Sequence, residues 1–140
     1  MIPRAMFAAL LIGCVSVPAV AQDLPNLIGT WKGSAEAVHV GPTPYRPAGE
    51  AGVTFSADPI EFTYRITEQK DHRFAGEMSG GTGTETIIGS LRHGNEDGIM
   101  LDADGQYQFT LRDSDTMDLC YSHLNPTSRV VACWTVTRTE

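Results

Sequence analysis

From residue 26 onward, hydrophobic and polar residues alternate over short segments that are separated by turn-forming residues. The alternation is clearest in residues 60–67, where every second residue is hydrophobic and the residues between are polar. A period of two is typical of a β-strand with one buried face. This part of the chain contains no helical period of useful length. We therefore expect an all-β protein.

Clusters of Gly, Pro, Asn and Asp divide the chain into about eight such segments. The expected strands are residues 28–40, 60–67, 73–79, 84–91, 98–102, 106–112, 116–124 and 129–138. Residues 41–58 are rich in Pro and Gly and are expected to form a long loop. The remaining connections suit short hairpins. The pattern predicts an antiparallel up-and-down sheet of about eight strands, which best protects its edges by closing into a barrel.

Two cysteines lie in the last two expected strands. If the turn between these strands is centred between Pro126 and Thr127, Cys120 lies directly opposite Cys133. Side chains in such a pair are about 5 Å apart. We expect a disulfide on the outer wall, worth about 3 kcal/mol in the chain-entropy description. The alternative is a pair of free buried thiols.

The inward positions of the expected barrel carry several aromatic side chains. Small eight-stranded barrels either fill their interior with side chains or hold one small ligand. Aromatic rings with polar tips can form apolar walls and also orient a ligand. The candidate ligand-binding residues are Phe62, Tyr64, Tyr107, Tyr121, His123 and Trp134. The alternative is a packed core with the tyrosine hydroxyls at its rim.

The first 21 residues have the pattern of a secretory signal peptide. Arg4 precedes an uncharged hydrophobic run that is too short to span a membrane, and a small-x-small site ends at Ala21. We expect residues 1–21 to be removed and residues 22–140 to form a single β-barrel domain, either periplasmic or secreted. A Leu-Ile-Gly-Cys sequence ending at Cys14 leaves a lipoprotein anchored at Cys14 as the alternative.

Charge and motifs narrow the function classes. The 140-residue chain has a formal net charge of -7, which argues against nucleic-acid binding. The sequence contains no second hydrophobic run that would predict a transmembrane segment. No His or Cys pair has zinc spacing, and the Asp residues of 96–118 suit turns. Because no motif of a hydrolase, metalloprotease or phosphate-binding loop occurs, we expect no metal, cofactor or catalytic residues.

The sequence Gly29-Thr30-Trp31 resembles the Gly-x-Trp signature of the calycin superfamily, which includes lipocalins, fatty-acid-binding proteins and avidins. The resemblance implies that Trp31 packs across the closed end of the barrel, with a basic residue from the last strand lying on it. Arg138 matches that position, and an Arg–Trp stack is favourable as a cation–π contact. An eight-stranded chain without a C-terminal helix is more similar to avidins than to typical lipocalins.

These features favour an exported, non-enzymatic, calycin-like β-barrel that binds a small apolar or amphipathic ligand non-covalently. The expected site is the open end near residues 41–58. Two alternatives remain open. One is an interaction protein, such as an inhibitor of an envelope or host enzyme, that acts through the 41–58 loop. The other is an enzyme without a recognisable motif.

Overall fold

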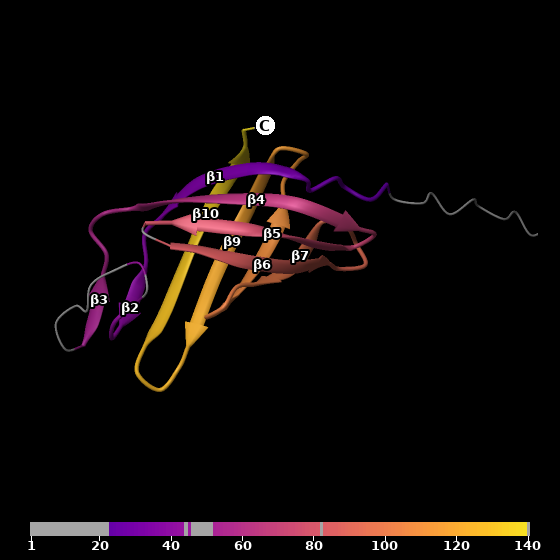
Figure 1. Ribbon diagram of the computed structural model, residues 1–140. Helices are drawn as coiled ribbons and strands as arrows, with labels where there is room; N and C mark the ends of the chain where they lie inside the picture. The colour runs from indigo at the N-terminus through magenta and orange to yellow at the C-terminus, as the bar shows by residue number, and fades with distance from the viewer. Residues whose placement is uncertain (1–22, 44, 46–51, 82, 140) are drawn as a thin grey trace, which may run out of the picture.

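The protein is a closed antiparallel β-barrel with a two-stranded extension (Figure 1). The computed structural model describes residues 23–43, 45, 52–81 and 83–139. The strands are β1 (Gly29–Ala35), β2 (Val38–Val40), β3 (Val53–Phe55), β4 (Ile60–Lys70), β5 (Arg73–Gly80), β6 (Gly83–Leu91), β7 (Asp97–Leu101), β8 (Gln106–Leu111), β9 (Thr116–Leu124) and β10 (Arg129–Arg138). Strands β1 and β4–β10 form the barrel, which closes because β1 pairs with both β4 and β10. The predicted all-β, eight-stranded barrel is confirmed.

The first expected strand, residues 28–40, is divided in the structure. Both β1 and β2 pair with β10 in one continuous register, with Trp31 opposite Arg138 and His39 opposite Val130. On its other side, however, β1 pairs with β4, whereas β2 pairs with β3. This change of partner separates β1 from β2. The expectation of a single strand was therefore wrong, although its register along β10 holds.

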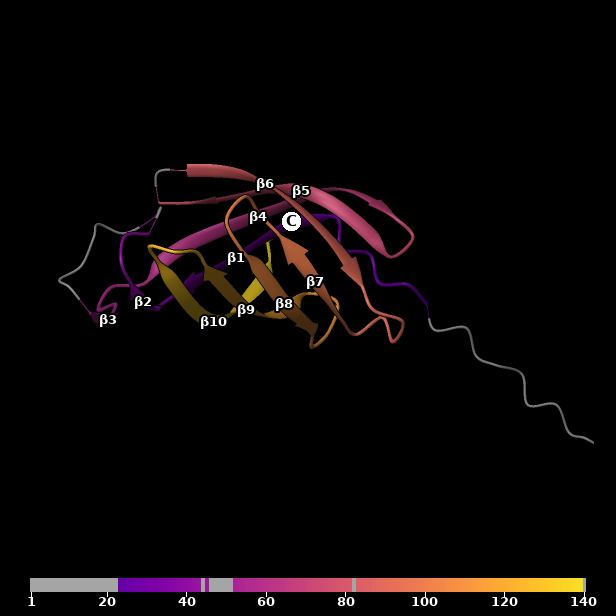
Figure 2. The same ribbon diagram turned by 90° about the horizontal axis from the view of Figure 1, so that it is seen from below.

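The expected 41–58 loop is also only partly a loop. It contains β3, which pairs with β2 and extends the sheet beyond the barrel. Residues 44 and 46–51 lie outside the described residues. The other seven expected strands agree with β4–β10 to within three residues at each end. In two views of the molecule, the β2–β3 extension projects from the same end (Figures 1 and 2).

The core fills most of the barrel. Trp31, Tyr64, Met78, Ile87 and Val136 have 1% or less of their surface exposed. They come from five different strands. Because their side chains occupy the middle of the barrel, the alternative of a packed core holds for most of the interior.

The end of the barrel near the first described residues is closed by Trp31. Its indole nitrogen donates a hydrogen bond to the Leu27 carbonyl at 3.0 Å. The guanidinium carbon of Arg138 lies 4.2 Å from the centre of the Trp31 ring. Arg138 also donates to the carbonyls of Asn26 and Ser114. One cation–π contact and several charge-assisted hydrogen bonds therefore hold the last strand against the first.

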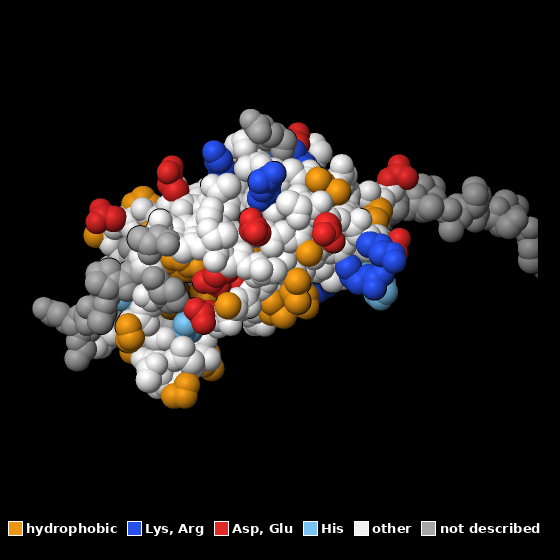
Figure 3. Space-filling model, in the orientation of Figure 1, with side chains coloured by type: hydrophobic (Ala, Val, Ile, Leu, Met, Phe, Trp, Pro, Cys, Tyr) orange, Lys and Arg blue, Asp and Glu red, His pale blue; other side chains and the backbone are white. Residues whose placement is uncertain are grey.

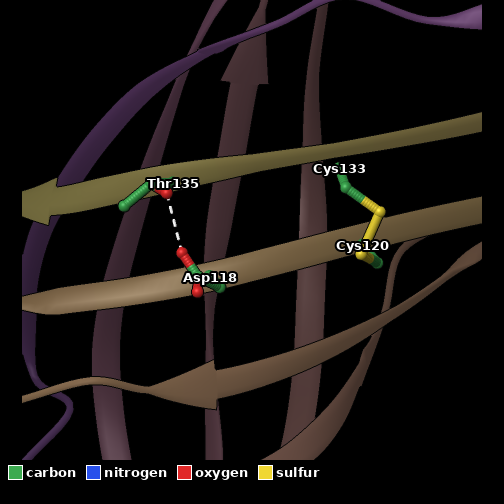
Figure 4. Close-up of a disulfide and its surroundings, with 4 residues drawn as sticks. All are labelled: Asp118, Cys120, Cys133 and Thr135. Atoms are coloured by element: carbon green, nitrogen blue, oxygen red, sulfur yellow. Dashed lines mark hydrogen bonds between the residues drawn. A yellow bond between two sulfur atoms is a disulfide. The ribbon is translucent and has the colours of Figure 1, made fainter.

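The β9–β10 hairpin has the predicted register, with Cys120 opposite Cys133. The two residues form a disulfide on the exposed face of the hairpin (Figure 4). On the same face, the Thr135 hydroxyl donates a 2.7 Å hydrogen bond to Asp118. The predicted disulfide is confirmed, and so is its position on the outer wall.

Candidate functional site

A cavity remains at the open end of the barrel, beside the β2–β3 extension. Its volume is about 50 Å³, counted as the space that the centre of a water molecule can reach. On this measure one water needs about 10–15 Å³. The cavity therefore accepts several waters or one small ligand, and it is smaller than the 300–1,000 Å³ pockets that hold drug-sized molecules.

The cavity brings together five of the six predicted ligand-binding residues. These are Phe62, Tyr107, Tyr121, His123 and Trp134, which line it from four strands. The sixth, Tyr64, lies elsewhere. It is 1% exposed and packs edge-on to Tyr107 within the core, with 5.9 Å between ring centres. The structure therefore places Tyr64 in the core and not among the residues that line the cavity.

The aromatic rings form a continuous wall around the cavity. Ring centres are 5.6 Å apart for Tyr45 and Phe62, and 5.6 Å apart for Phe62 and Trp134. The wall continues from Trp134 to Tyr107 at 6.1 Å and from Tyr107 to Tyr121 at 4.7 Å. The angles between these ring planes range from 29° to 87°. Because the planes differ, the wall curves around the space and does not form a flat stack.

Carboxylates accept hydrogen bonds from the hydroxyls of two of these rings. The Tyr45 hydroxyl donates a 2.6 Å hydrogen bond to Glu85, and the Tyr107 hydroxyl donates a 2.9 Å hydrogen bond to Asp102. Asp102 is itself held by the backbone amide of Gly105. Each hydroxyl is therefore committed to a carboxylate. The Tyr107 hydroxyl therefore has its proton engaged and can meet a ligand only as an acceptor.

The pKa values of the tyrosines reflect this setting. Burial is the largest cause that raises the pKa of Tyr107 and of Tyr45, and the carboxylates of Asp102 and Glu85 raise them further. The pKa of Tyr121 is also raised, first by burial and then by the charges of these acids. A neutral phenol and a nearby anion are the stable combination in this wall.

One polar group in the wall has no hydrogen-bond partner among the described residues. The indole nitrogen of Trp134 is buried and donates to no acceptor there. Trp134 lines the cavity. A buried donor without a partner costs about 1–3 kcal/mol, so such groups in native proteins call for an explanation. Because a water molecule does not reach this nitrogen, an acceptor would contact it only after a small movement of the wall.

His123 is held by the turn that joins β9 to β10. Its Nε2 lies 2.8 Å from the Ser128 hydroxyl and 2.9 Å from the Asn125 amide nitrogen. The Asn125 side-chain oxygen accepts hydrogen bonds from the backbone amides of Thr127 and Ser128. The amide hydrogens of Asn125 can only be donated, so the lone pair of His123 Nε2 faces the turn and the ring proton lies on Nδ1.

The Ser128–His123 contact resembles the pairing of a nucleophile with a base. Ser128 is 5% exposed, however, and it is not among the described residues that line the cavity. Its hydrogen bonds close a tight turn. We therefore assign the pair to the turn, where it fixes the orientation of His123 at the cavity wall.

The sequence interpretation missed His39. This side chain is 4% exposed, lines the cavity, and contacts the Gly41 carbonyl through Nδ1 at 3.1 Å. Because a carbonyl only accepts, Nδ1 donates this hydrogen bond. The alternation that begins at Trp31 and continues along the chain to His39 could have revealed this inward position.

Tyr45 and Glu85 were also missed. Tyr45 lies in the Pro-rich and Gly-rich segment, where no period indicates which way a side chain points. Glu85 has the pattern of an ordinary polar position in β6, and only the folded barrel brings it to Tyr45, 40 residues away in sequence. Among the described residues, no group of three or more His, Cys, Asp or Glu could hold a metal ion.

Within the described part of the chain, no helix is long and apolar enough to cross a membrane. In the side view of the molecule, acidic and histidine side chains lie with hydrophobic ones between the upper strands and the β9–β10 hairpin (Figure 3).

The comparisons with known proteins give no match to a family model, a curated protein or a solved structure.

Proposed function

We propose that the protein is an exported calycin-like barrel that binds a small molecule non-covalently in the cavity at its open end. The observation that carries the proposal is the aromatic cavity wall with the unpartnered Trp134 indole N–H in it. Ligand pockets typically combine apolar walls with a few polar groups that fix orientation. The small volume favours a ligand, or a ligand head group, of only a few non-hydrogen atoms.

Other features support the remaining parts of the proposal. The contact between Arg138 and Trp31 is the one that the calycin resemblance implies. A disulfide is typical of proteins that leave the reducing cytoplasm, which agrees with an export signal in residues 1–21. Residues 1–21 lie outside the described residues, so the signal peptide rests on the sequence pattern.

A cavity-filling variant tests the proposal. Ala132 is 8% exposed and lines the cavity, so Ala132→Leu places extra carbon atoms in the space that the ligand would occupy. We expect neutral fragments of a few non-hydrogen atoms to shift the NMR signals of Trp134 and Tyr121 in the native protein but not in Ala132→Leu. Ala75→Leu is the control, because Ala75 is on β5 and is absent from the cavity lining. Equal fragment binding by all three proteins would contradict the proposed site.

A second candidate function is interaction with a protein partner through the β2–β3 extension. Val53 is 65% exposed and Phe55 is 79% exposed, and Val131 is 53% exposed on the neighbouring β10. The register aligns Phe55 with Val38 and Val38 with Val131, so these side chains form one row on the outer face. Contiguous exposed apolar side chains often mark protein interfaces. This favours the interaction protein acting through residues 41–58 over the enzyme alternative.

This second candidate has its own test. Phe55→Ser removes the largest exposed apolar side chain of the row without touching the cavity lining. The interaction hypothesis predicts that this variant no longer co-purifies with the envelope or host enzyme that the native protein binds, while fragment binding is unchanged. A partner that is retained by Phe55→Ser would count against this surface.

A further inference from the structure

We propose that the cavity selects a small alkylammonium ion, such as a trimethylammonium head group. This inference rests on the proposed function and goes further by naming the chemical class of the ligand. Three observations on the same site support it. Several aromatic rings surround the cavity, carboxylates accept hydrogen bonds from two of the tyrosine hydroxyls, and no carboxylate is among the described residues that line the cavity.

Five aromatic rings line the cavity and can attract a cation. Trp134, Tyr107, Tyr121, Phe62 and Tyr45 surround one small space, and neighbouring ring centres are 4.7–6.1 Å apart. A cation is attracted to an aromatic face when it lies within about 6 Å of the ring centre, and several rings around one site form an aromatic cage. An aromatic cage binds methylated ammonium groups because their charge is spread over methyl surfaces that also pack against the rings.

Two carboxylates next to the tyrosines strengthen the attraction for a cation. Glu85 accepts the Tyr45 hydroxyl, and Asp102 accepts the Tyr107 hydroxyl. A phenol that donates to a carboxylate has a more electron-rich ring, which strengthens its attraction for a cation. The charges of Asp102, Asp104 and Glu85 also act on Tyr121. Among the described lining residues the only basic side chains are His39 and His123, and no Lys or Arg occurs there.

The position of the acids decides the type of cation. No carboxylate is among the described residues that line the cavity, because Glu85 and Asp102 lie behind tyrosine hydroxyls. A primary ammonium has three N–H groups that need acceptors when they leave water. A trimethylammonium group has none and loses little by entering this space.

The net charge of the chain agrees with this proposal. The whole chain has a formal charge of -7. The basic residues Arg73 and Arg92 at the opposite end are paired with Asp71 and Asp97. A small cation would therefore be attracted to the molecule as a whole.

The test compares choline with its neutral carbon isostere, dimethylbutanol, in which a tert-butyl group replaces the trimethylammonium group. Binding is followed by NMR through the indole N–H signals. The chain has two tryptophans, so loss of one signal in Trp134→Phe assigns the signal of Trp134. We expect choline to bind about tenfold more tightly than the isostere, since the two differ only in charge.

Charge-removing variants test the role of the acids. Glu85→Gln and Asp102→Asn keep an oxygen for the tyrosine hydroxyl but remove the charge. Each should weaken choline binding about three- to fivefold and leave the isostere unaffected. Glu77→Gln is the matched control, because it changes the net charge equally at an exposed position of β5. It should change neither affinity.

The outcomes distinguish a failure of the ammonium selectivity from a failure of the proposed function. If the isostere binds as tightly as choline, or if the neutral fragments bind and choline does not, the ammonium selectivity is wrong and the proposed function stands. If choline, the isostere and the fragments all leave the Trp134 signal unmoved, the proposed function fails as well. An equal loss of choline binding in Glu77→Gln would show only a general charge effect and would also overturn the inference.

Discussion

At the scale of single residues, the two tryptophans have opposite roles although both come from strands of the same barrel. The Trp31 indole N–H is paired with a backbone carbonyl and its face is covered by Arg138. The Trp134 N–H is buried without a partner, and its ring lines the cavity. Trp31 is thus part of the support of the fold, whereas Trp134 belongs to the proposed binding site.

A pair of matched substitutions tests this difference. Trp31→Phe leaves the Leu27 carbonyl unpaired and opens space in a fully buried site, so we expect a loss of about 2–4 kcal/mol in the free energy of unfolding. Trp134→Phe removes a donor that is unsatisfied, so stability should change by less than about 1 kcal/mol while ligand binding weakens. Denaturant unfolding measures both. Equal destabilisation by the two variants would contradict the assignment.

All four tyrosines of the chain have a raised pKa, mainly through burial. Unfolded tyrosines ionise near pH 10. Because folding favours the neutral phenols, their contribution to stability is complete below that pH and is lost as the pH rises above it. We expect little tyrosinate absorbance until the protein unfolds in alkali, with both changes occurring together. Titration of a tyrosine near pH 10 in a protein whose circular dichroism is still native would contradict this.

At the scale of strands, the sequence predicts local pairing better than it predicts exchange of partners. The β9–β10 register follows from one turn, and the positions of Cys120 and Cys133 confirm it. The division between β1 and β2 could not be predicted, because the alternation of residues continues through it. The division depends on β4 and β3, which lie far along the chain. His39 could have been predicted, because the same continuous alternation gives it an inward position.

The same hairpin allows a stability prediction. Replacing both Cys120 and Cys133 by Ser opens a link between residues 13 apart in sequence, which should cost about 3 kcal/mol. The control is Thr135→Val, which removes the exposed hydrogen bond to Asp118 on the same pair of strands and should cost less than about 1 kcal/mol. Thermal and denaturant unfolding measure both effects. A double serine variant as stable as Thr135→Val would show that the disulfide contributes little.

At the scale of the whole molecule, the two ends of the barrel differ. One end is closed by Trp31, Arg138 and the residues that precede β1. The other carries the cavity, the β2–β3 extension and the acidic groups behind the tyrosines. The sequence predicted the barrel and five of the residues that line the cavity. The size of the cavity and the acids behind its wall depend on packing between distant strands, which a period of two does not specify.

We propose an exported barrel that holds a small molecule, and one measurement tests both properties. Native mass spectrometry of the protein purified from its own host should give a chain that begins at Gln22, with its internal disulfide and one bound small molecule. Ala132→Leu, purified in the same way, should have the same chain mass without the bound molecule. A native chain that still carries residues 1–21 and holds no small molecule would contradict the account.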